Sequence, residues 1–216
     1  MLDVLLDLVL PRTCAGCEAA GTALCQTCRE LLEQPARGFV RPTPCPPGLP
    51  PLSAHLPYEG VAQRLLLAHK EQGQLHLTSF LGAALARAVG VHDLPVGLLL
   101  CPVPSSRRAV RQRGHDHALR LARAAATSLG PGVVAASLLR PARRVADQSG
   151  LTTAQRAANL RDALSAVPAL GTPVLVVDDV VTTGATVVEA TRALRAAGHQ
   201  VLGAAVVAAT TRRAGS

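Results

Sequence analysis

The stretch "VLVVDDVVTTGAT", residues 174–186, joins a short apolar run to two adjacent carboxylates and then to hydroxyl residues and a glycine. An apolar run of this length, bounded by turn-forming residues, is typical of a strand buried on both faces of a parallel sheet. A strand that only filled a core has no use for Asp178 and Asp179 at its end. Open α/β sheets bind ligands outside the carboxyl ends of their strands. The stretch therefore predicts a strand with a ligand site at its end.

Apolar periodicity around this stretch predicts alternating strands and helices. Buried strands are expected at 97–104, 172–179 and 200–209, and helices at 118–129 and 186–198. Strands that alternate with helices form right-handed crossovers and a mainly parallel sheet that is covered on both faces. The predicted fold class is therefore α/β.

Length and composition predict one compact core with a small appendage. The chain has 216 residues, of which 49% are apolar, and its mean hydropathy of +0.28 argues against disorder over most of its length. Residues 35–51 hold seven of the sixteen prolines, a composition that favours extended, semi-rigid backbone. We therefore expect an N-terminal module at 1–34, a proline-rich linker at 35–51 and the main domain at 52–216.

The opening "MLDVLLDLVLP" has leucines and valines at helical spacing, and Pro11 ends the pattern. Asp3 and Asp7 interrupt the apolar run and no basic segment precedes it, so it predicts a short amphipathic helix rather than a signal peptide. No other stretch is long and apolar enough to span a bilayer. We expect a cytoplasmic protein with reduced thiols and no membrane insertion.

Four cysteines near the N-terminus form two CxxC pairs separated by seven residues. Each pair can place two thiolates on one tetrahedral ion, and four ligands leave no open position, so the pattern predicts a structural Zn²⁺ site. Disulfides in an oxidising compartment are the alternative. The site is expected to stabilise a terminus too small to fold alone, although a docking surface is also conceivable. The expected ligands are Cys14, Cys17, Cys25 and Cys28.

The charge balance is basic, with 22 Lys and Arg against 14 Asp and Glu and a net charge of +8. Such a balance suits phosphate-bearing partners such as nucleotides or nucleic acid, but biased codon usage would also supply many arginines. Lys70 is the only lysine. A flexible point charge is one interpretation of that position, and a solvated surface residue is the other.

The residues after Asp178 and Asp179 favour phosphate binding. Backbone N–H groups at a helix N-terminus, with hydroxyls and a glycine, can hold a phosphate. The two acids, a few ångströms away, suit the vicinal hydroxyls of a ribose or a water-held Mg²⁺. Together they describe a ribose 5-phosphate, whereas the plain alternative is an acidic strand end before a capped helix. The expected phosphate-binding residues are Thr182, Thr183, Gly184, Ala185 and Thr186.

This stretch resembles the fingerprint of the type I phosphoribosyltransferases, which bind phosphoribosyl pyrophosphate (PRPP). Each position matches: four apolar residues, two acids, two apolar residues, then Thr-Thr-Gly-small-Thr. The resemblance implies the type I phosphoribosyltransferase fold, Mg²⁺ bound with PRPP, and contacts of Asp178 and Asp179 with the ribose 2- and 3-hydroxyls. It also implies that residues 182–186 hold the 5-phosphate.

Two further segments, "CPVPSSRRAVRQRGHDHALRLA" at 101–122 and "DQSGLTTAQRAANLRDAL" at 147–164, together with the four cysteines, are similar to the layout of the ComF competence proteins. The resemblance implies an accessory protein of DNA uptake in natural transformation, with single-stranded DNA and an uptake helicase as partners. One departure follows Gly114, where the family commonly has Phe-Asn-Gln and this chain has His115–His117. Any base or DNA contact assigned there is therefore open.

Several polar residues are candidates for the pyrophosphate or for a mobile lid. A loop at a strand end, rich in arginine forks, suits pyrophosphate oxygens. The segment that begins near Thr152 carries a capping-box pattern, and the resemblance suggests that it forms a lid over the substrate. The histidines at 115 and 117 could suit a metal, but no third ligand is evident. The candidates are Lys70, Ser105, Arg107, Arg108, Gln148 and Arg156.

The acceptor of a transferase reaction has no clear binding site in the sequence. Phe39, Tyr58 and Phe80 are the only aromatic residues, so a nucleobase has little to stack on. Three hypotheses follow: a ComF-like accessory protein of DNA uptake with a PRPP site, a nucleobase-salvage phosphoribosyltransferase, and a sensor that binds PRPP or nucleotides without turnover. An enzyme would displace pyrophosphate at ribose C1 through an oxocarbenium-like transition state.

Overall fold

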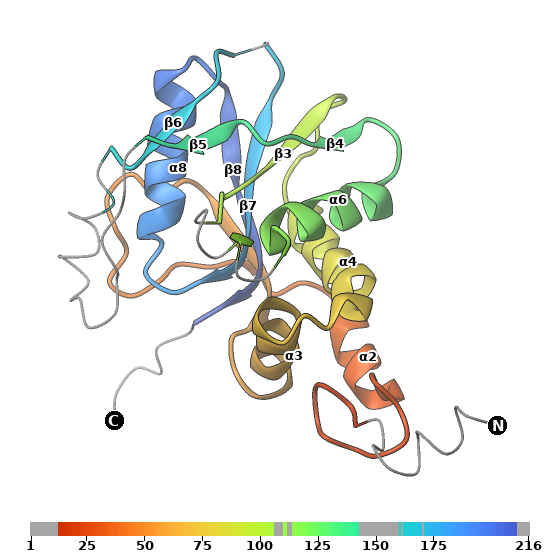
Figure 1. Ribbon diagram of the computed structural model, residues 1–216. Coiled ribbons are helices and arrows are strands. Elements are labelled where there is room, and N and C mark those ends of the chain that lie inside the picture. The colour runs from red at the N-terminus through yellow and green to blue at the C-terminus, as the bar shows by residue number, and fades with distance from the viewer. Residues whose placement is uncertain are drawn as a thin grey trace.

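The computed structural model describes residues 13–105, 110–111, 114–142, 160, 162–169 and 171–210 (Figure 1). The helix expected at 1–11 lies outside these residues. So do four of the pyrophosphate and lid candidates, which are Arg107, Arg108, Gln148 and Arg156.

Six strands form one twisted sheet. Every neighbouring pair is parallel except the outermost pair at one edge, which is antiparallel. A second, two-stranded antiparallel sheet is formed by β5 (Leu139–Pro141) and β6 (Leu164–Ala166). The order across the main sheet is β1 (Gly38–Phe39), β2 (Leu52–Pro57), β8 (Val201–Ala209), β7 (Val174–Val181), β3 (Leu98–Pro102) and β4 (Val133–Ala135).

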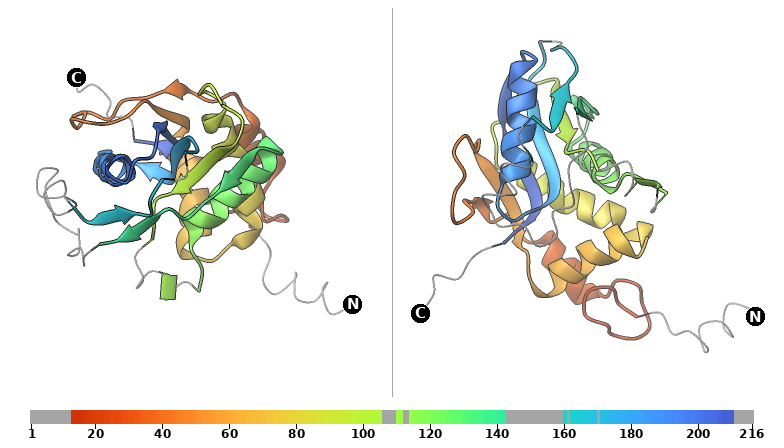
Figure 2. Two further views of the ribbon diagram at one scale, coloured as in Figure 1. Left: turned by 90° about the horizontal axis from the view of Figure 1, so that it is seen from above. Right: turned by 60° about the vertical axis from the view of Figure 1, so that its left-hand side comes forward.

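Helices cover both faces of this sheet, as the left-hand view of Figure 2 shows. Helix α8 (Ala185–Ala196) lies on one face, and α4 (Thr78–Val89) and α6 (His117–Leu129) lie on the other. Helix α3 (Gly60–Glu71), the short 3-10 helix η1 (Leu75–Leu77) and α2 (Gln26–Glu33) complete the described helices. The expected α/β class with a mainly parallel sheet is confirmed.

Strand β7 shows why the apolar run of the sequence is continuous. Leu175 and Val177 belong to the core beneath α4 and α6, whereas Val174 and Val176 belong to the core beneath α8. Alternate side chains of a strand point to opposite faces, so a strand covered on both sides needs apolar residues throughout. All four of these residues are buried.

The path of the chain places a crevice between β3 and β7. From β3 the chain crosses through α6 to β4 on one side, then returns to β7 on the other side of β3 and continues through α8 to β8. The last β3–β7 pair is Pro102 with Val177, so Asp178 is the first residue beyond it. Ligands of open α/β sheets bind where the strand order reverses in this way.

The cysteine module packs directly on the main sheet domain. Leu24 and Leu32 share one buried core with Leu65 of α3. The Arg64 side chain donates to the carbonyl oxygen of Gly16, and the His55 ring Nε2 lies 3.0 Å from the carbonyl oxygen of Leu32. The module therefore contacts α3, which lies next to α2 in Figure 1 and also carries Lys70, the residue that contacts Asp179 of β7.

The proline-rich segment runs along the sheet edge and over the start of α8. Its strand β1 pairs with β2, and the Val40 N–H donates to the Leu52 carbonyl oxygen at 2.8 Å. A methyl group on Gly184 would lie 3.0 Å from Leu49. None of the described helices combines the length and the apolar character that crossing a membrane requires.

Candidate functional site

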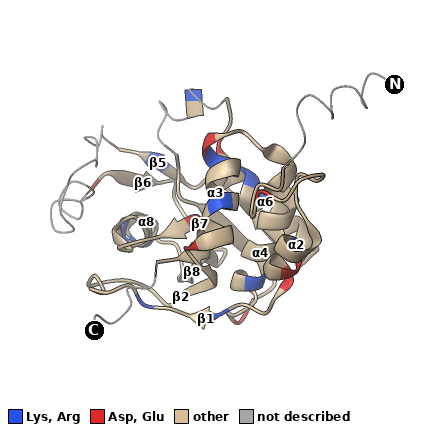
Figure 3. Cartoon of the chain, turned by 90° about the horizontal axis from the view of Figure 1, so that it is seen from below, with Lys and Arg blue, Asp and Glu red and all other residues tan. Residues whose placement is uncertain are grey.

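A cavity of about 390 Å³ lies at the carboxyl ends of β2, β3 and β7. Figure 3 views this end of the molecule, where α3, α6 and β7 come together. Its volume lies within the range of small-molecule and cofactor sites. The polar residues in its wall include Lys70, Ser105, His117, Asp178, Asp179 and Thr182.

Asp179 is held by groups from three elements. Its Oδ2 accepts from Lys70 Nζ of α3 at 2.8 Å and lies 3.3 Å from His117 Nε2 of α6. Its Oδ1 accepts from the Val180 backbone N–H at 2.8 Å. Burial alone would raise the pKa of Asp179, but the hydrogen bond from His117 and the charge of Lys70 outweigh it and hold the pKa well below its usual range. Asp179 is therefore a buried carboxylate.

Asp178 has the opposite electrostatic character. It remains partly exposed, and its Oδ1 accepts from the Asp179 backbone N–H at 2.8 Å. Burial and the adjacent charge of Asp179 raise the pKa of Asp178 well above its ordinary value, and Lys70 offsets only part of this effect. The two neighbouring carboxyls therefore differ: the pKa of the anchored Asp179 is lowered, whereas the pKa of Asp178, which lines the cavity, is raised.

The turn after β7 brings the start of α8 to the cavity. Gly184 stands at the helix N-cap with φ 77°, a left-handed conformation that glycine adopts without strain. The Thr183 hydroxyl oxygen accepts from the Ala185 N–H at 3.4 Å. Thr182 and Thr186 line the cavity. The first N–H groups of α8 and these hydroxyls therefore suit an anion such as phosphate.

The three side chains of the His-Asp-His segment, residues 115–117, make three different kinds of contact. Asp116 caps α6 by accepting from the N–H groups of Ala118 and Leu119. His117 enters the cavity wall, and the His115 ring packs edge-on against His69 with centroids 6.3 Å apart. Asp116 thus serves the helix, and His117 serves the site.

Ser105, one of the pyrophosphate candidates, lies in the cavity wall just beyond β3. Its hydroxyl donates to Asp116 Oδ1 at 3.1 Å and lies 3.2 Å from His117 Nδ1. Lys70, another candidate, has its ammonium group on Asp179. The structure therefore brings Lys70, Ser105 and the two acids of the motif to one cavity.

Tyr58 and His69 lie at or near the cavity and were not singled out from the sequence as site residues. Tyr58 lines it, because β2 ends beside β8 and the Tyr58 N–H donates to the Ala209 carbonyl oxygen at 2.8 Å. His69 is buried with its Nε2 3.0 Å from the Thr78 hydroxyl. Burial, together with the charges of His117 and His115, lowers the pKa of His69 to about 4, so it is neutral at pH 7.

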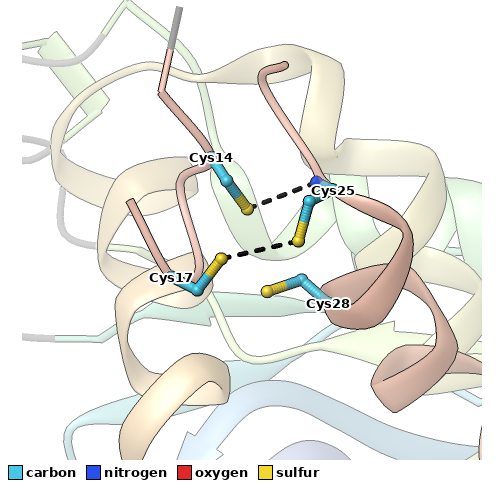
Figure 4. A group of neighbouring side chains, drawn as sticks. All are labelled: Cys14, Cys17, Cys25 and Cys28. Carbon is cyan, nitrogen blue, oxygen red and sulfur yellow. Dashed lines mark hydrogen bonds between the residues drawn. The ribbon is translucent and has the colours of Figure 1, made fainter. Parts of the chain in front are cut away.

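The four cysteines form a separate cluster (Figure 4). Their sulfur atoms all lie within 4.8 Å of one another, and Cys17 Sγ is 3.5 Å from Cys25 Sγ. A tetrahedral ion with Zn–S distances of about 2.3 Å requires sulfur atoms about 3.8 Å apart. In the part of the chain that the structure describes, this is the one group of Cys, His, Asp and Glu side chains with metal-site spacing. The cluster therefore fits zinc.

The thiol environments also suit a divalent cation. Burial acts to raise the pKa of Cys14, but backbone N–H groups, including that of Cys25 at 3.3 Å, lower it to about 6. Burial and the neighbouring sulfurs raise the pKa of Cys28. A bound cation offsets the opposite pKa shifts of Cys14 and Cys28, because it stabilises all four thiolates together.

Packing in the cluster favours glycine at position 16, since a methyl group there would lie 2.8 Å from Cys28 Sγ.

Comparison with protein families gives a match that covers the C-terminal part of the chain. Residues 116–215 match the model of the phosphoribosyl transferase domain. No curated protein matches the chain significantly.

Two solved structures are similar to the chain at 19% identity. The orotate phosphoribosyltransferase of Mycobacterium tuberculosis H37Rv, in complex with Fe(III) dicitrate, aligns with a TM-score of 0.41 over 84% of this chain and 83% of its own. The UMP synthase of Leishmania donovani aligns with a TM-score of 0.38 over 68% of this chain, which spans 24% of that protein. The domain match over residues 116–215, the mainly parallel sheet and the motif at the end of β7 together support a type I phosphoribosyltransferase-like domain in this chain.

Proposed function

We propose that the cavity at the ends of β3 and β7 binds PRPP. The observation that carries this proposal is the convergence of the Asp178 carboxyl, the turn at 182–186 and Ser105 on one cavity. The start of α8 suits the 5-phosphate, and Asp178 suits the ribose hydroxyls. Ser105, with Arg107 and Arg108 outside the described residues, is proposed for the pyrophosphate.

Mg²⁺ is expected to bind together with PRPP. The cation would neutralise pyrophosphate oxygens, and hard oxygen ligands such as the Asp178 carboxylate and water are those it prefers. Asp179 is less suited to direct coordination, because Lys70 and His117 already engage one of its oxygens. Asp178 is therefore the proposed carboxylate on the ligand side, and Asp179 the proposed anchor behind it.

If the protein is an enzyme, the reaction is displacement of pyrophosphate at ribose C1 by a nitrogen nucleophile. The C1–O bond to pyrophosphate breaks, the new C1–N bond forms, and pyrophosphate leaves with the electron pair of the broken bond. The chain's own contribution is to orient both ends of PRPP and to stabilise the developing pyrophosphate charge. Gln148 and Arg156, also outside the described residues, are proposed as contacts from a lid that excludes water.

The finer proposal is a ComF-like accessory role in DNA uptake in the cytoplasm. It is supported by the cysteine module at the N-terminus, by the segments at 101–122 and 147–164, and by the net charge of +8. Contact with single-stranded DNA or an uptake helicase would be electrostatic, so it should weaken steeply as salt increases. The zinc cluster is proposed to be structural, and the division at residues 34 and 51 separates that module from the PRPP-binding domain.

Tyr58 favours a second candidate function, nucleobase salvage. Phe39 is 61% exposed at the far sheet edge, and Phe80 lies under Arg29 with the guanidinium 5.0 Å from the ring centroid. Tyr58 is thus the aromatic residue in the cavity wall, where it could support a stacked base. A sensor that binds PRPP without turnover shares the same pocket but needs no acceptor.

One set of assays separates these functions. PRPP binding is measured by calorimetry, and pyrophosphate release from PRPP is measured with each nucleobase and with single-stranded DNA. DNA binding is followed by fluorescence anisotropy at two salt concentrations. Release with one nucleobase supports salvage, whereas salt-sensitive DNA binding without such release supports the accessory role. PRPP binding without either supports a sensor. If PRPP does not bind, the proposed function is wrong.

A further inference from the structure

His117 joins two walls of the cavity that come from distant parts of the chain. It is the first residue of α6, and its side chain is 6% exposed. Its Nε2 lies 3.3 Å from Asp179 Oδ2 at the end of β7, and its Nδ1 lies 3.2 Å from the Ser105 hydroxyl oxygen beyond β3. The imidazole therefore spans from the loop proposed for the pyrophosphate to the motif proposed for the ribose.

The hydrogen-bonding capacity of imidazole suits this bridge. When Nε2–H of the neutral ring donates to the Asp179 carboxylate, Nδ1 is an acceptor that faces Ser105, and the single hydroxyl hydrogen of Ser105 can point either to Nδ1 or to Asp116 Oδ1. The backbone that carries the ring is also held in place. The Asp116 carboxylate accepts from two N–H groups in the first turn of α6 and lies 3.1 Å from the Ser105 hydroxyl. The start of α6 is thus a rigid support for a side chain that contacts both walls.

The position of Asp179 depends strongly on this support. Its Oδ2 is engaged by Lys70 and His117, and its Oδ1 by the Val180 N–H. The Lys70 side chain is 31% exposed, so its ammonium group is partly hydrated, whereas the His117 contact is buried. The adjacent Asp178 is tied to the same backbone through the Asp179 N–H. A change at His117 should therefore alter the aim of both carboxyls.

We infer that His117 is a positioning residue of the PRPP site: it orients Asp179 and couples the ribose side of the cavity to Ser105. The inference rests on the proposed function and adds a residue outside the acidic motif. It also explains the third residue of the His-Asp-His segment, which the motif alone leaves without a role. If the His117 ring only filled the core, its replacement would lower stability but would not change the orientation of the Asp179 carboxylate.

The test compares PRPP affinity, measured by calorimetry with Mg²⁺, among variants of the full zinc-loaded chain. His117→Leu removes both polar contacts and should weaken binding roughly tenfold to a hundredfold. His117→Gln keeps an N–H donor and should restore the affinity to within about threefold of wild type. The matched control, His76→Leu on the exposed face of η1, should bind as wild type does.

A double-mutant cycle tests whether His117 acts through Asp179. In the Asp179→Asn background, His117→Leu should cause little further loss, because the carboxylate that it orients is gone. If His117→Leu fails to fold, His117→Phe takes its place in the cycle, because it keeps an aromatic ring at the buried position and lacks both nitrogen contacts; its loss of affinity should likewise nearly vanish in the Asp179→Asn background.

The outcomes separate this inference from the proposed function. Absence of PRPP binding by the wild type overturns the proposed function itself. If the wild type binds and the folded His117→Leu variant binds equally well, His117 is not a positioning residue. Additive losses in the cycle, or a His117→Gln variant as weak as His117→Leu, would also overturn the inference.

Discussion

The ammonium group of Lys70 lies 2.8 Å from Asp179 Oδ2, so the chain's single lysine joins α3 to the end of β7. The two residues are separated by 109 positions in the sequence. Because α3 also carries the contacts to the cysteine module, the ion pair connects the ligand cavity with the helix that the module supports. The pair therefore contributes both to the fold and to the geometry of the proposed PRPP site.

The Lys70–Asp179 pair should make stability sensitive to acid. The folded-state pKa of Asp179 is held below its ordinary value, so the pair stabilises the fold above a pH of about 4 and this contribution is lost as the pH falls further. Lys70→Gln should therefore lower the urea midpoint at pH 7 and have a smaller effect at pH 3. Arg123→Gln, on the exposed face of α6, is the matched control. An equal loss at both pH values would contradict the ion-pair role.

The two motif acids should affect stability in opposite directions. Asp179→Asn removes a buried, paired carboxylate and should cost roughly 1.5–3 kcal/mol of the free energy of unfolding at pH 7. Asp178 has a raised folded-state pKa, so its ionisation reduces stability as the pH rises above about 4. Asp178→Asn should therefore raise the urea midpoint at pH 7 while weakening PRPP binding. Destabilisation by Asp178→Asn that is equal at pH 3 and pH 7 would show that its charge carries no such cost.

Zinc removal should unfold the cysteine module and loosen α3. One zinc per chain is expected by elemental analysis, and chelation should lower the melting temperature, because the metal–sulfur bonds that tie the two CxxC pairs together are then lost. Cys25→Ser should lose the metal, whereas Cys45→Ser, exposed and outside the cluster, should retain it. Retention of zinc and of the full melting temperature by Cys25→Ser would exclude the four-cysteine site.

Gly184→Ala should impair the turn before α8 for two reasons. The left-handed φ of 77° disfavours any side chain, and the new methyl group would lie 3.0 Å from Leu49 and 3.4 Å from Pro42 and Pro46. Gly73→Ala, at φ 66°, shares the positive φ without the close contacts, since nothing lies within 4 Å of its added methyl group. Gly184→Ala should lower the urea midpoint more than the control substitution does, and only Gly184→Ala should also weaken PRPP binding. Equal effects of the two substitutions would contradict the packing argument.

Local patterns predicted the parts of the site that depend on sequence spacing. One apolar run and the turn-forming residues after it predicted strand β7, the turn at Gly184 and helix α8. The spacing of the two CxxC pairs predicted the cysteine cluster. Helix α3 also has a local sequence signal, since its buried residues Ala62, Leu65, Leu66 and His69 recur at helical spacing. Asp116 likewise precedes an apolar helix, which is typical of an N-cap.

Tertiary contacts could not be predicted in the same way. The partners of Asp179 lie on α3 and α6, and Tyr58 reaches the cavity because β2 ends beside β8. Local residue spacing cannot predict these contacts, because they depend on the order of the strands in the sheet. The sequence therefore proposed the candidate residues, whereas the topology determined which of them meet at the cavity.

The central claim is that the cavity binds PRPP through the two acids of the motif, and calorimetry tests it most directly. Zinc-loaded wild-type protein and the variant Asp178→Asn/Asp179→Asn, checked for folding by circular dichroism, are titrated with PRPP in the presence and absence of Mg²⁺. We predict binding by the wild type that requires Mg²⁺ and is lost in the variant. No binding by the wild type, or equal binding by the folded variant, would contradict the claim.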